Sequence, residues 1–180
     1  MQSNANLLLR VKKQDPIAQK ALYDKYASIF YGICLRYIKD AAEAEDVMIE
    51  SFYKIFTKID QFNESGSFEG WMKRIVINQA LMQIRKNSNL NLHVNIDHAN
   101  DINERATAIT DINHAEILEL MHDLPVGYRT IFNLYVVEGY KHREIAEKLN
   151  ISINTSKSQL ILAKKKLREL YKKKHNQKIS

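Results

Sequence analysis

The chain contains few residues that interrupt a helix. Two prolines and five glycines are spread over 180 residues, and apolar residues make up 45% of the sequence. Because proline and glycine are the residues that most often end helices, so few of them favour long helices. A chain of this length folds as one medium domain or two small ones. The sequence therefore predicts an all-α protein.

Several classes of protein are excluded by features that the sequence lacks. No uninterrupted apolar stretch reaches the roughly 20 residues that span a bilayer. Residues 1–9 lack the basic start and the longer apolar stretch of a secretory signal. The single cysteine, Cys34, cannot form an internal disulfide. Together these features predict a cytoplasmic protein.

Three helices are expected in the first half of the chain. Asp15-Pro16 is typical of a helix cap followed by a first-turn proline, and a helix over residues 17–38 follows it. A second helix is predicted over residues 43–59 and, after a loop at residues 63–67, a third over residues 68–86. The apolar positions recur at helical spacing: Leu22, Tyr26, Ile29, Phe30 and Ile33; then Met48, Phe52, Ile55, Phe56 and Ile59; then, with one amide, Trp71, Ile75, Asn78 and Met82.

A domain boundary is expected after residue 86. Residues 87–111 are rich in Asn, Asp and His and show weak periodicity, which is typical of a linker. We therefore expect two small helical domains joined by a polar linker: a first domain over residues 10–87, a linker over 88–112 and a second domain over 113–174. A tail over 175–180 follows, and the run of Lys172, Lys173 and Lys174 is expected to fray.

Positive charge is concentrated at one end of the chain. Residues 141–180 hold 12 Lys or Arg against 3 Asp or Glu, a net charge of +9, so the other 15 basic and 18 acidic residues sum to −3. A charge run is often only a solvated face, but basicity confined to one end favours a polyanion partner there.

A helix-turn-helix is predicted within this basic end. A helix over residues 128–137 follows Pro125; then residues 144–149 form a short helix and residues 150–152 a turn. The second helix begins near Ile153, with Ser152 or Asn154 as its cap. One face of that helix is apolar and the opposite face is mostly basic: Leu160, Ala163, Leu167 and Leu170 on the first, and Lys157, Ile161, Lys164 and Arg168 on the second.

The start of this second helix is the expected reading surface. In a helix-turn-helix the first residues of the second helix enter the major groove. Base edges would therefore be approached by Thr155, Lys157, Ser158 and Ile161, and phosphates by Lys164 and Lys165. An amphipathic basic helix that never meets DNA is the alternative interpretation.

Four stretches, in order, resemble the extracytoplasmic-function (ECF) sigma factors of the sigma-70 family. Residues 46–56 (DVMIESFYKIF) are similar to the polymerase-binding helix of that family, and residues 71–80 (WMKRIVINQA) to the helix after it. Residues 124–129 (LPVGYR), and residues 144–146 (EIA) with 155–160 (TSKSQL), resemble its second domain. The resemblance covers residues 16–172 and implies a factor that binds core RNA polymerase and directs promoter-specific initiation.

The resemblance also implies roles for individual residues. The first domain would dock on the clamp helices of the large polymerase subunit and open the minus-ten element; the second would bind the minus-35 element. Polymerase contact falls on Asp46, Glu50, Phe52 and Tyr53. Contact with melted DNA falls on the loop residues Phe62, Asn63 and Ser65 and on Arg74 and Asn78, with Arg85 and Lys86 adding positive charge. Contact with duplex DNA falls on His142 and Arg143 near the backbone, besides the second helix.

Some of these residues also fit simpler roles. Asp46 and Glu50 suit the N-terminal half of any helix, where the macrodipole favours acids. Phe52 suits a core position, Asn78 a buried amide, and His142 an incidental histidine. The sequence also departs from the family pattern: Ile49 stands where Gln is common, and Gln159, Ile161 and Leu162 replace polar or basic residues. The reading helix thus lacks guanidinium groups that bind guanine, which favours thymine methyl contacts or DNA shape.

Two other functions stay open at this point, and a third partner is implied. A stand-alone helix-turn-helix regulator would bind operators without polymerase, and a helical adaptor would not bind DNA at all. The family resemblance also implies an anti-sigma protein, of a kind that can be membrane-anchored, over the faces around Phe52 and Ile131.

Enzymatic and metal-dependent functions are not expected. The sequence has no phosphate-binding glycine loop, no Cys-x-x-Cys and no nucleophile motif, so no cofactor and no small-molecule substrate are predicted. His93, Asp97 and His98 lack a fourth ligand at a defined spacing.

Overall fold

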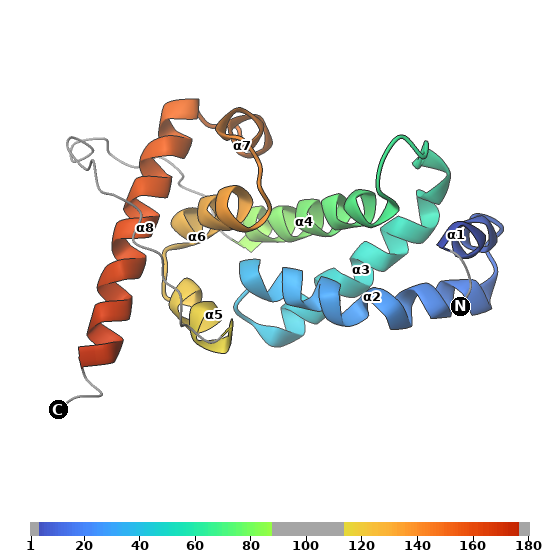
Figure 1. The fold of residues 1–180 in the computed structure, drawn as a ribbon, viewed down its shortest axis with the longest axis horizontal. Helices are drawn as coiled ribbons and strands as arrows, with labels where there is room; N and C mark the ends of the chain where they lie inside the picture. Colours follow the sequence, from blue (N-terminus) through green and yellow to red (C-terminus); the bar gives the residue numbers. More distant parts are fainter. Residues whose placement is uncertain (1–3, 88–113, 177–180) are drawn as a thin grey trace. The chain divides into compact units, whose positions relative to one another are not determined.

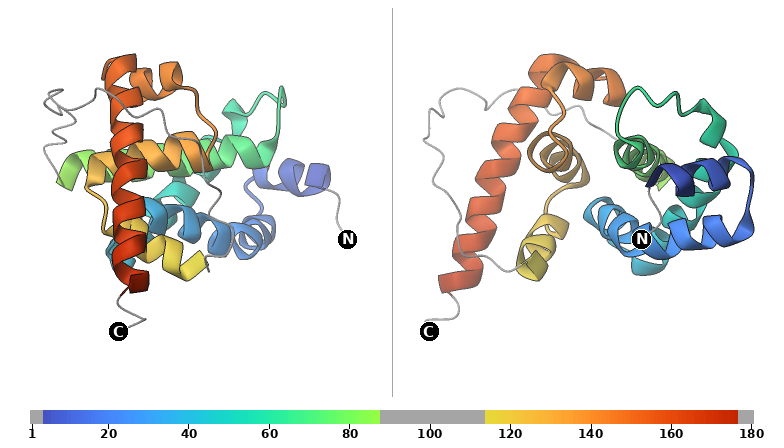
Figure 2. Two further views of the ribbon diagram at one scale, coloured as in Figure 1. Left: turned by 60° about the vertical axis from the view of Figure 1, so that its left-hand side comes forward. Right: turned by 45° about the vertical axis from the view of Figure 1, so that its right-hand side comes forward.

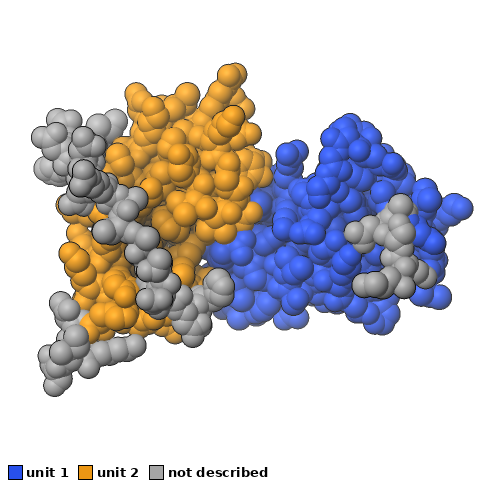
Figure 3. Space-filling view, viewed as in Figure 1, with its two compact units in different colours: residues 1–87 blue, residues 88–180 orange. Residues whose placement is uncertain are grey.

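The computed structural model describes residues 4–87 and 114–176 of the chain. Within those ranges every regular element is helical, so the predicted all-α class is confirmed. The chain divides into two compact units, residues 1–87 and 88–180 (Figure 1, Figure 3). The expected linker over residues 88–112 lies outside the described residues.

Unit 1 is built on three helices that pack against one another in pairs, with a short N-terminal helix beside them (Figure 1). Its elements in chain order are α1 (Asn4–Lys12), α2 (Pro16–Tyr37), α3 (Ala41–Thr57), the 3-10 turn η1 (Ile59–Gln61) and α4 (Phe68–Asn87). The largest side chains enclosed between them are Leu22, Phe30, Tyr37, Ile55, Ile59 and Met72.

Aspartates begin two of these helices, as the sequence pattern predicts for the first. The Asp15 carboxylate accepts hydrogen bonds from the backbone N–H of Ile17 (2.9 Å) and Ala18 (3.4 Å). The Asp40 carboxylate likewise accepts a hydrogen bond from the backbone N–H of Glu43 at 2.8 Å. A side-chain hydrogen bond from Arg10 lowers the pKa of Asp15. Such caps satisfy backbone donors that a helix start otherwise leaves open.

Helix α1 was not predicted, and it belongs to unit 1. Leu8 and Val11, three positions apart, are buried against the rest of the unit, where α1 packs on α2 and η1. The first domain therefore begins before residue 10, the boundary expected from the sequence. The apolar run Leu7-Leu8-Leu9 was the signal that could have indicated it.

The buried side of α4 differs from the stripe that the sequence suggests. Its enclosed residues are Met72, Val76, Ile77, Gln79, Ala80, Leu81 and Ile84. Asn78 and Met82 are exposed, so that side of α4 is not core. Asn78 is consequently no buried amide, which settles the alternative left open by the sequence.

Cys34 is buried in α2, and burial raises the pKa of its thiol to about 12. Because the thiolate is the reactive form, we expect a disulfide reagent at pH 8 to modify the folded chain on the order of a thousandfold more slowly than the unfolded chain. Stopped-flow absorbance with and without guanidinium measures this ratio. Equal rates would contradict the burial.

Unit 2 is organised around one long helix. Its elements are α5 (His114–His122), α6 (Val126–Phe132), the π-helical turn η2 (Asn133–Val137), α7 (His142–Leu149) and α8 (Ile153–Asn176). Figure 2 shows α8 running past the others, with α7 near its start and α5 near its end. The core between α5 and α8 joins Leu120, Met121, Leu124 and Leu167, against which Tyr128, Phe132 and Tyr171 pack.

Two details of unit 2 differ from the sequence-based prediction. The helix expected over residues 128–137 is α6 followed by the wider turn η2, where the backbone N–H of Glu138 bonds to Asn133 O at 2.9 Å. The lysines expected to fray lie in α8, which reaches Asn176. Lys174 Nζ lies 2.6 Å from a Glu119 oxygen on α5, and this hydrogen bond raises the pKa of Lys174.

Candidate nucleic-acid and polymerase interfaces

The helix-turn-helix is formed by α7, a tight turn and α8. Asn150 ends α7 with φ +55°, in the left-handed region that asparagine tolerates better than most residues. Ser152 then caps α8: its hydroxyl oxygen accepts a hydrogen bond from Thr155 N–H at 2.9 Å. Ala146 is buried where the two helices approach each other. Both the turn and the cap follow the sequence-based prediction.

Helix α8 has a buried face and an exposed basic face, as its spacing predicts. Leu160, Ala163 and Leu167 are buried, and so are the polar residues Ser156 and Gln159. The exposed side carries Lys157, Ile161, Lys164 and Lys165. Ile161 is 42% exposed.

Two polar residues near the start of α8 use their side-chain hydroxyls in hydrogen bonds within the domain. The Thr155 hydroxyl lies 2.8 Å from the Ser152 hydroxyl, and the Ser158 hydroxyl donates to Thr155 O at 3.1 Å. Both side chains are half-buried, so they lie at the edge of the basic face rather than at its centre.

His142 is engaged inside the domain and is not an incidental surface residue. Its Nδ1 lies 2.9 Å from the buried Ser156 hydroxyl, and its ring stacks on Tyr135 with 4.3 Å between the centroids. Burial, with Lys157 and Lys164 nearby, lowers the pKa of His142. The hydrogen bond between His142 and Ser156 joins α7 to α8. Arg143, beside it, is exposed and lies 3.3 Å from Glu147.

In unit 1, the predicted polymerase contacts on α3 divide into exposed and buried residues. Asp46, Glu50 and Tyr53 are exposed, Tyr53 by 67%. Phe52 is only 3% exposed, and its ring packs on those of Tyr23, Phe30 and Phe56 at 4.8–5.9 Å. In this conformation the core encloses the Phe52 ring.

Ile49 is an exposed residue of this face that the sequence-based assignment missed. It is 51% exposed and lies four positions before Tyr53, on the same side of α3. The missed signal was its place between Asp46 and Tyr53: an apolar residue outside the buried stripe of an amphipathic helix.

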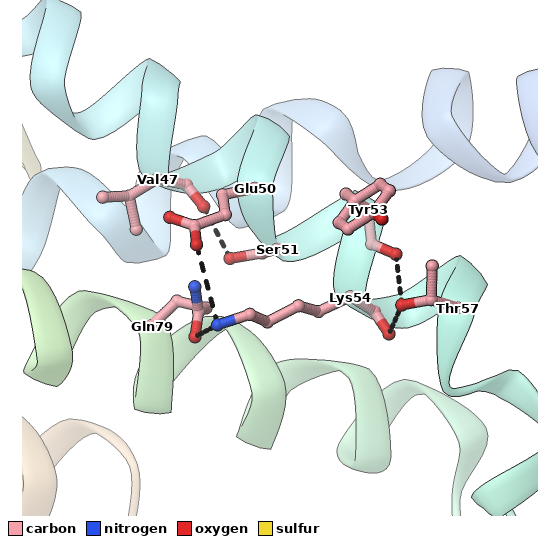
Figure 4. A network of polar contacts seen from close by, with 7 residues as sticks. All are labelled: Val47, Glu50, Ser51, Tyr53, Lys54, Thr57 and Gln79. Carbon is pink, nitrogen blue, oxygen red and sulfur yellow. Dashed lines mark hydrogen bonds and ion pairs between the residues drawn. The ribbon is translucent and has the colours of Figure 1, made fainter.

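A polar network fastens this face of α3 to α4 (Figure 4). Lys54 reaches across and donates to the Gln79 side-chain oxygen at 2.6 Å, while Glu50 lies 3.6 Å from the same ammonium. On the buried side, the Ser51 hydroxyl donates to Val47 O at 2.6 Å. The position of the exposed face is thus fixed relative to the helix that follows.

The loop between η1 and α4 is closed by aromatic rings at its two ends. Phe62 is 6% exposed and packs on Phe68 and Trp71, with centroids 5.2 and 5.7 Å away. Its ring therefore anchors one end of the loop. Asn63 and Ser65 are exposed, and the Asn63 oxygen accepts from the N–H (3.1 Å) and the hydroxyl (2.6 Å) of Ser65.

The exposed face of α4 carries the remaining predicted DNA contacts. Arg74, Asn78, Arg85 and Lys86 are all exposed. Arg74, Asn78 and Arg85 are four and seven positions apart, so at 3.6 residues per turn they follow one side of the helix. The structure thus brings these three together on a surface that adjoins the loop.

Neither a metal site nor a membrane helix is found in the part of the chain that the structure describes. Within residues 4–87 and 114–176, no group of three His, Cys, Asp or Glu side chains is placed to hold a metal ion. His93, Asp97 and His98 lie outside those ranges. No helix in them is both long and apolar enough to cross a bilayer.

Comparison with known proteins identifies the family. The pattern described as Sigma-70 region 2 matches residues 22–90, and that described as Sigma-70, region 4 matches residues 114–167. The ECF RNA polymerase sigma factor SigW of Bacillus subtilis (strain 168) is 28% identical over 173 residues, which is 89% of this chain and 92% of that protein. The chain is an ECF sigma factor of the sigma-70 family.

Two solved structures share the fold of this sigma factor. CnrH in complex with the cytosolic domain of CnrY matches 92% of this chain and 95% of that one, with a TM-score of 0.53 and 18% identity. The sigma factor RpoE in complex with the anti-sigma factor NepR from Bartonella quintana matches 85% and 96%, with a TM-score of 0.56 and 19% identity.

As a sigma factor, the chain directs promoter-specific transcription initiation with RNA polymerase and is not an enzyme. The region 2 match covers most of unit 1, and the region 4 match contains the helix-turn-helix. A stand-alone regulator would not account for region 2, and an adaptor that does not bind DNA would not account for the helix-turn-helix. The family resemblance seen in the sequence is confirmed, and with it the predicted function.

Proposed function

We propose that initiation is divided among three surfaces of this sigma factor. The exposed face of α3 docks on core RNA polymerase, the loop at residues 62–67 and the exposed face of α4 hold melted minus-ten DNA, and the basic face of α8 binds the minus-35 element. The observation that carries this proposal is the charge of the exposed faces, which is acidic and apolar on α3 and basic on α4 and α8.

The docking surface on α3 combines an apolar centre with acidic neighbours. Ile49 and Tyr53 supply exposed apolar area, and Asp46 and Glu50 supply charge beside them. Interfaces of this kind take most of their binding energy from a few large side chains at the centre, while rim charges guide association. We assign the central role to Tyr53, and we assign Phe52 the role of supporting the helix from below.

The second surface holds single-stranded DNA without any chemical step. An unstacked base can be captured by hydrogen bonds to its edge, and the freed strand follows positive charge. Asn63 and Ser65 are exposed at the tip of the loop, where they can meet a base. Arg74, Asn78, Arg85 and Lys86 would then follow the strand along α4.

The third surface reads duplex DNA upstream. Lys157, Lys164 and Lys165 would neutralise phosphates, while Thr155, Ser158 and Ile161 would lie at base edges. The exposed Ile161 suits a thymine methyl group, because this face offers no arginine in its first turns that could grip guanine. His142 and Arg143 would support the DNA backbone from α7.

We also propose a cytoplasmic location and a protein inhibitor. Core polymerase and promoters are cytoplasmic in bacteria, so a sigma factor acts there. Two proteins of similar fold have been solved with an inhibitor or partner chain, one of them named as an anti-sigma factor. An anti-sigma partner of this chain would cover the α3 face around Tyr53 and the surface near Ile131.

The test is transcription from a genomic library by core polymerase with the purified chain. We expect discrete start sites that core alone does not give, each preceded by two recurrent sequence elements. The measurement is sequencing of transcript 5′ ends. A mixture with the chain heat-denatured beforehand is the control, and identical start sites in both mixtures would contradict the proposal.

A further inference from the structure

The N-terminal helix α1 lies outside the family match, which begins at residue 22, and it has no role in the three surfaces above. It is nevertheless connected to one of them. Lys12, in its last turn, places its ammonium 2.9 Å from a carboxylate oxygen of Glu64 in the loop at residues 62–67. The two residues are 52 positions apart in the chain.

The loop has few other attachments to the rest of unit 1. Every residue from Asn63 to Ser67 is exposed, and the Asn63–Ser65 hydrogen bonds stay within the loop. The ends are held by the Phe62 ring and by Ser67, whose hydroxyl accepts from Gly70 N–H at 3.3 Å. Lys12 bonds to the loop from another helix.

A cavity beneath the loop makes this attachment important. It has a volume of about 310 Å³, with Leu7 and Leu8 of α1 on one wall and Glu64, Gly66 and Ser67 of the loop on the other. Where close packing is missing, position is set by the points of attachment and not by shape. The loop therefore lies over a pocket rather than on packed side chains, and the ion pair is a point of attachment across it.

The backbone at the point of attachment also needs support. Glu64 has φ +61°, in the left-handed region that residues other than glycine rarely adopt. Such a conformation persists only where the surroundings hold it. The Lys12 ammonium bonds to the residue in that conformation, next to Asn63 and Ser65.

We propose that α1 positions the base-capturing loop of this sigma factor through the Lys12–Glu64 ion pair. This inference rests on the proposed role of the loop in holding melted DNA. Lys12 and Glu64 are positioning residues: neither needs to touch DNA, and both act by fixing where Asn63 and Ser65 stand. The helix is then a part of the promoter-opening device that the family pattern does not contain.

Charge reversal tests the pair on a promoter found in the library experiment, with holoenzyme assembled from the full chain. We expect Lys12→Glu and Glu64→Lys each to lower the amount of open complex about fivefold, since an attraction becomes a repulsion or is lost. The double reversal restores the pair and should return the amount of open complex to within about twofold of the original. Permanganate reactivity of melted thymines measures the open complex.

The two single reversals separate positioning from bulk charge. They change the net charge in opposite directions. If only attraction to DNA mattered, Lys12→Glu would therefore give less open complex than the original chain, and Glu64→Lys would give more. If the ion pair positions the loop, both variants give less open complex. Reversal of the exposed Lys20–Asp24 pair on α2, whose charged atoms lie 2.5 Å apart, is the control and should leave the open complex unchanged.

Further readouts separate this proposal from misfolding and from failure of the proposed function. Affinity for core polymerase and the thermal melting curve should be unchanged in every variant; if a reversal lowers the melting temperature, Lys12→Gln takes its place. On a promoter whose minus-ten element is already unpaired by mismatched bases, the single variants should lose less open complex. Wild-type activity with no effect of any reversal, or a double variant as weak as the singles, overturns the positioning role alone. No start site with the original chain overturns the proposed function.

Discussion

Reversing two lysines on the exposed face of α8, in the variant Lys157→Glu with Lys164→Glu, should lower promoter affinity of the holoenzyme by about 100-fold. The two residues lie seven positions apart, so they point to the same side of α8, and both are exposed. Each supplies a charge that would release a counterion from DNA, so the slope of log affinity against log salt should also fall by about 2. Fluorescence anisotropy of labelled promoter DNA over a salt series gives both numbers.

The same helix offers a matched control. Lys166 and Lys173 are also seven positions apart, and their positions turn them to the other side of α8, where Lys166 lies 3.8 Å from Glu169. The variant Lys166→Glu with Lys173→Glu has the same net charge as the first one. It should keep most of the affinity. If the two double variants lose affinity equally, the basic face of α8 is not the DNA surface, and only overall charge matters.

The helices that were predicted well are those with a capping residue or a long apolar stripe in their sequence. Helices α2 and α3 combine an aspartate cap or a long apolar stripe with helical spacing, and the turn before α8 carries a capping serine, so all were predicted closely. Helix α1 is short, with only Leu8 and Val11 clearly buried, and three consecutive leucines do not reveal a face. The lysines at the end of α8 looked like a solvated run because Glu119, their partner, lies 55 positions away.

The candidate surfaces were predicted less completely than the fold. Charged residues such as Lys157 and Arg74 are exposed, as expected, because burying an unpaired cation is costly. For the neighbours Phe52 and Tyr53, helical spacing already placed Phe52 in the apolar stripe, and the structure has Phe52 buried and Tyr53 exposed. Phe62 lies in none of the predicted helices, so no spacing indicated that its ring is buried.

Truncating Phe52 and truncating Tyr53 should therefore have opposite consequences. We expect Phe52→Ala to destabilise unit 1 by about 3–5 kcal/mol, because it removes a ring enclosed by Tyr23, Phe30 and Phe56 and leaves a cavity. Tyr53→Ala should change the free energy of unfolding by less than about 0.5 kcal/mol, since the side chain is mostly exposed. Denaturant unfolding followed by circular dichroism measures both.

Substitutions at Phe52 and Tyr53 should affect the affinity for polymerase in the reverse order of their effects on stability. We expect Tyr53→Ala to weaken binding to core polymerase by about 10- to 30-fold if Tyr53 is the centre of the docking surface, since a central aromatic anchor contributes about 2 kcal/mol. Phe52→Leu, which keeps most of the buried volume, should bind almost as tightly as the original chain. Competition with a labelled sigma factor for core polymerase gives the affinities. Weak binding by Phe52→Leu together with normal binding by Tyr53→Ala would mean that the α3 helix opens on docking and that its buried ring, rather than its exposed face, meets the polymerase.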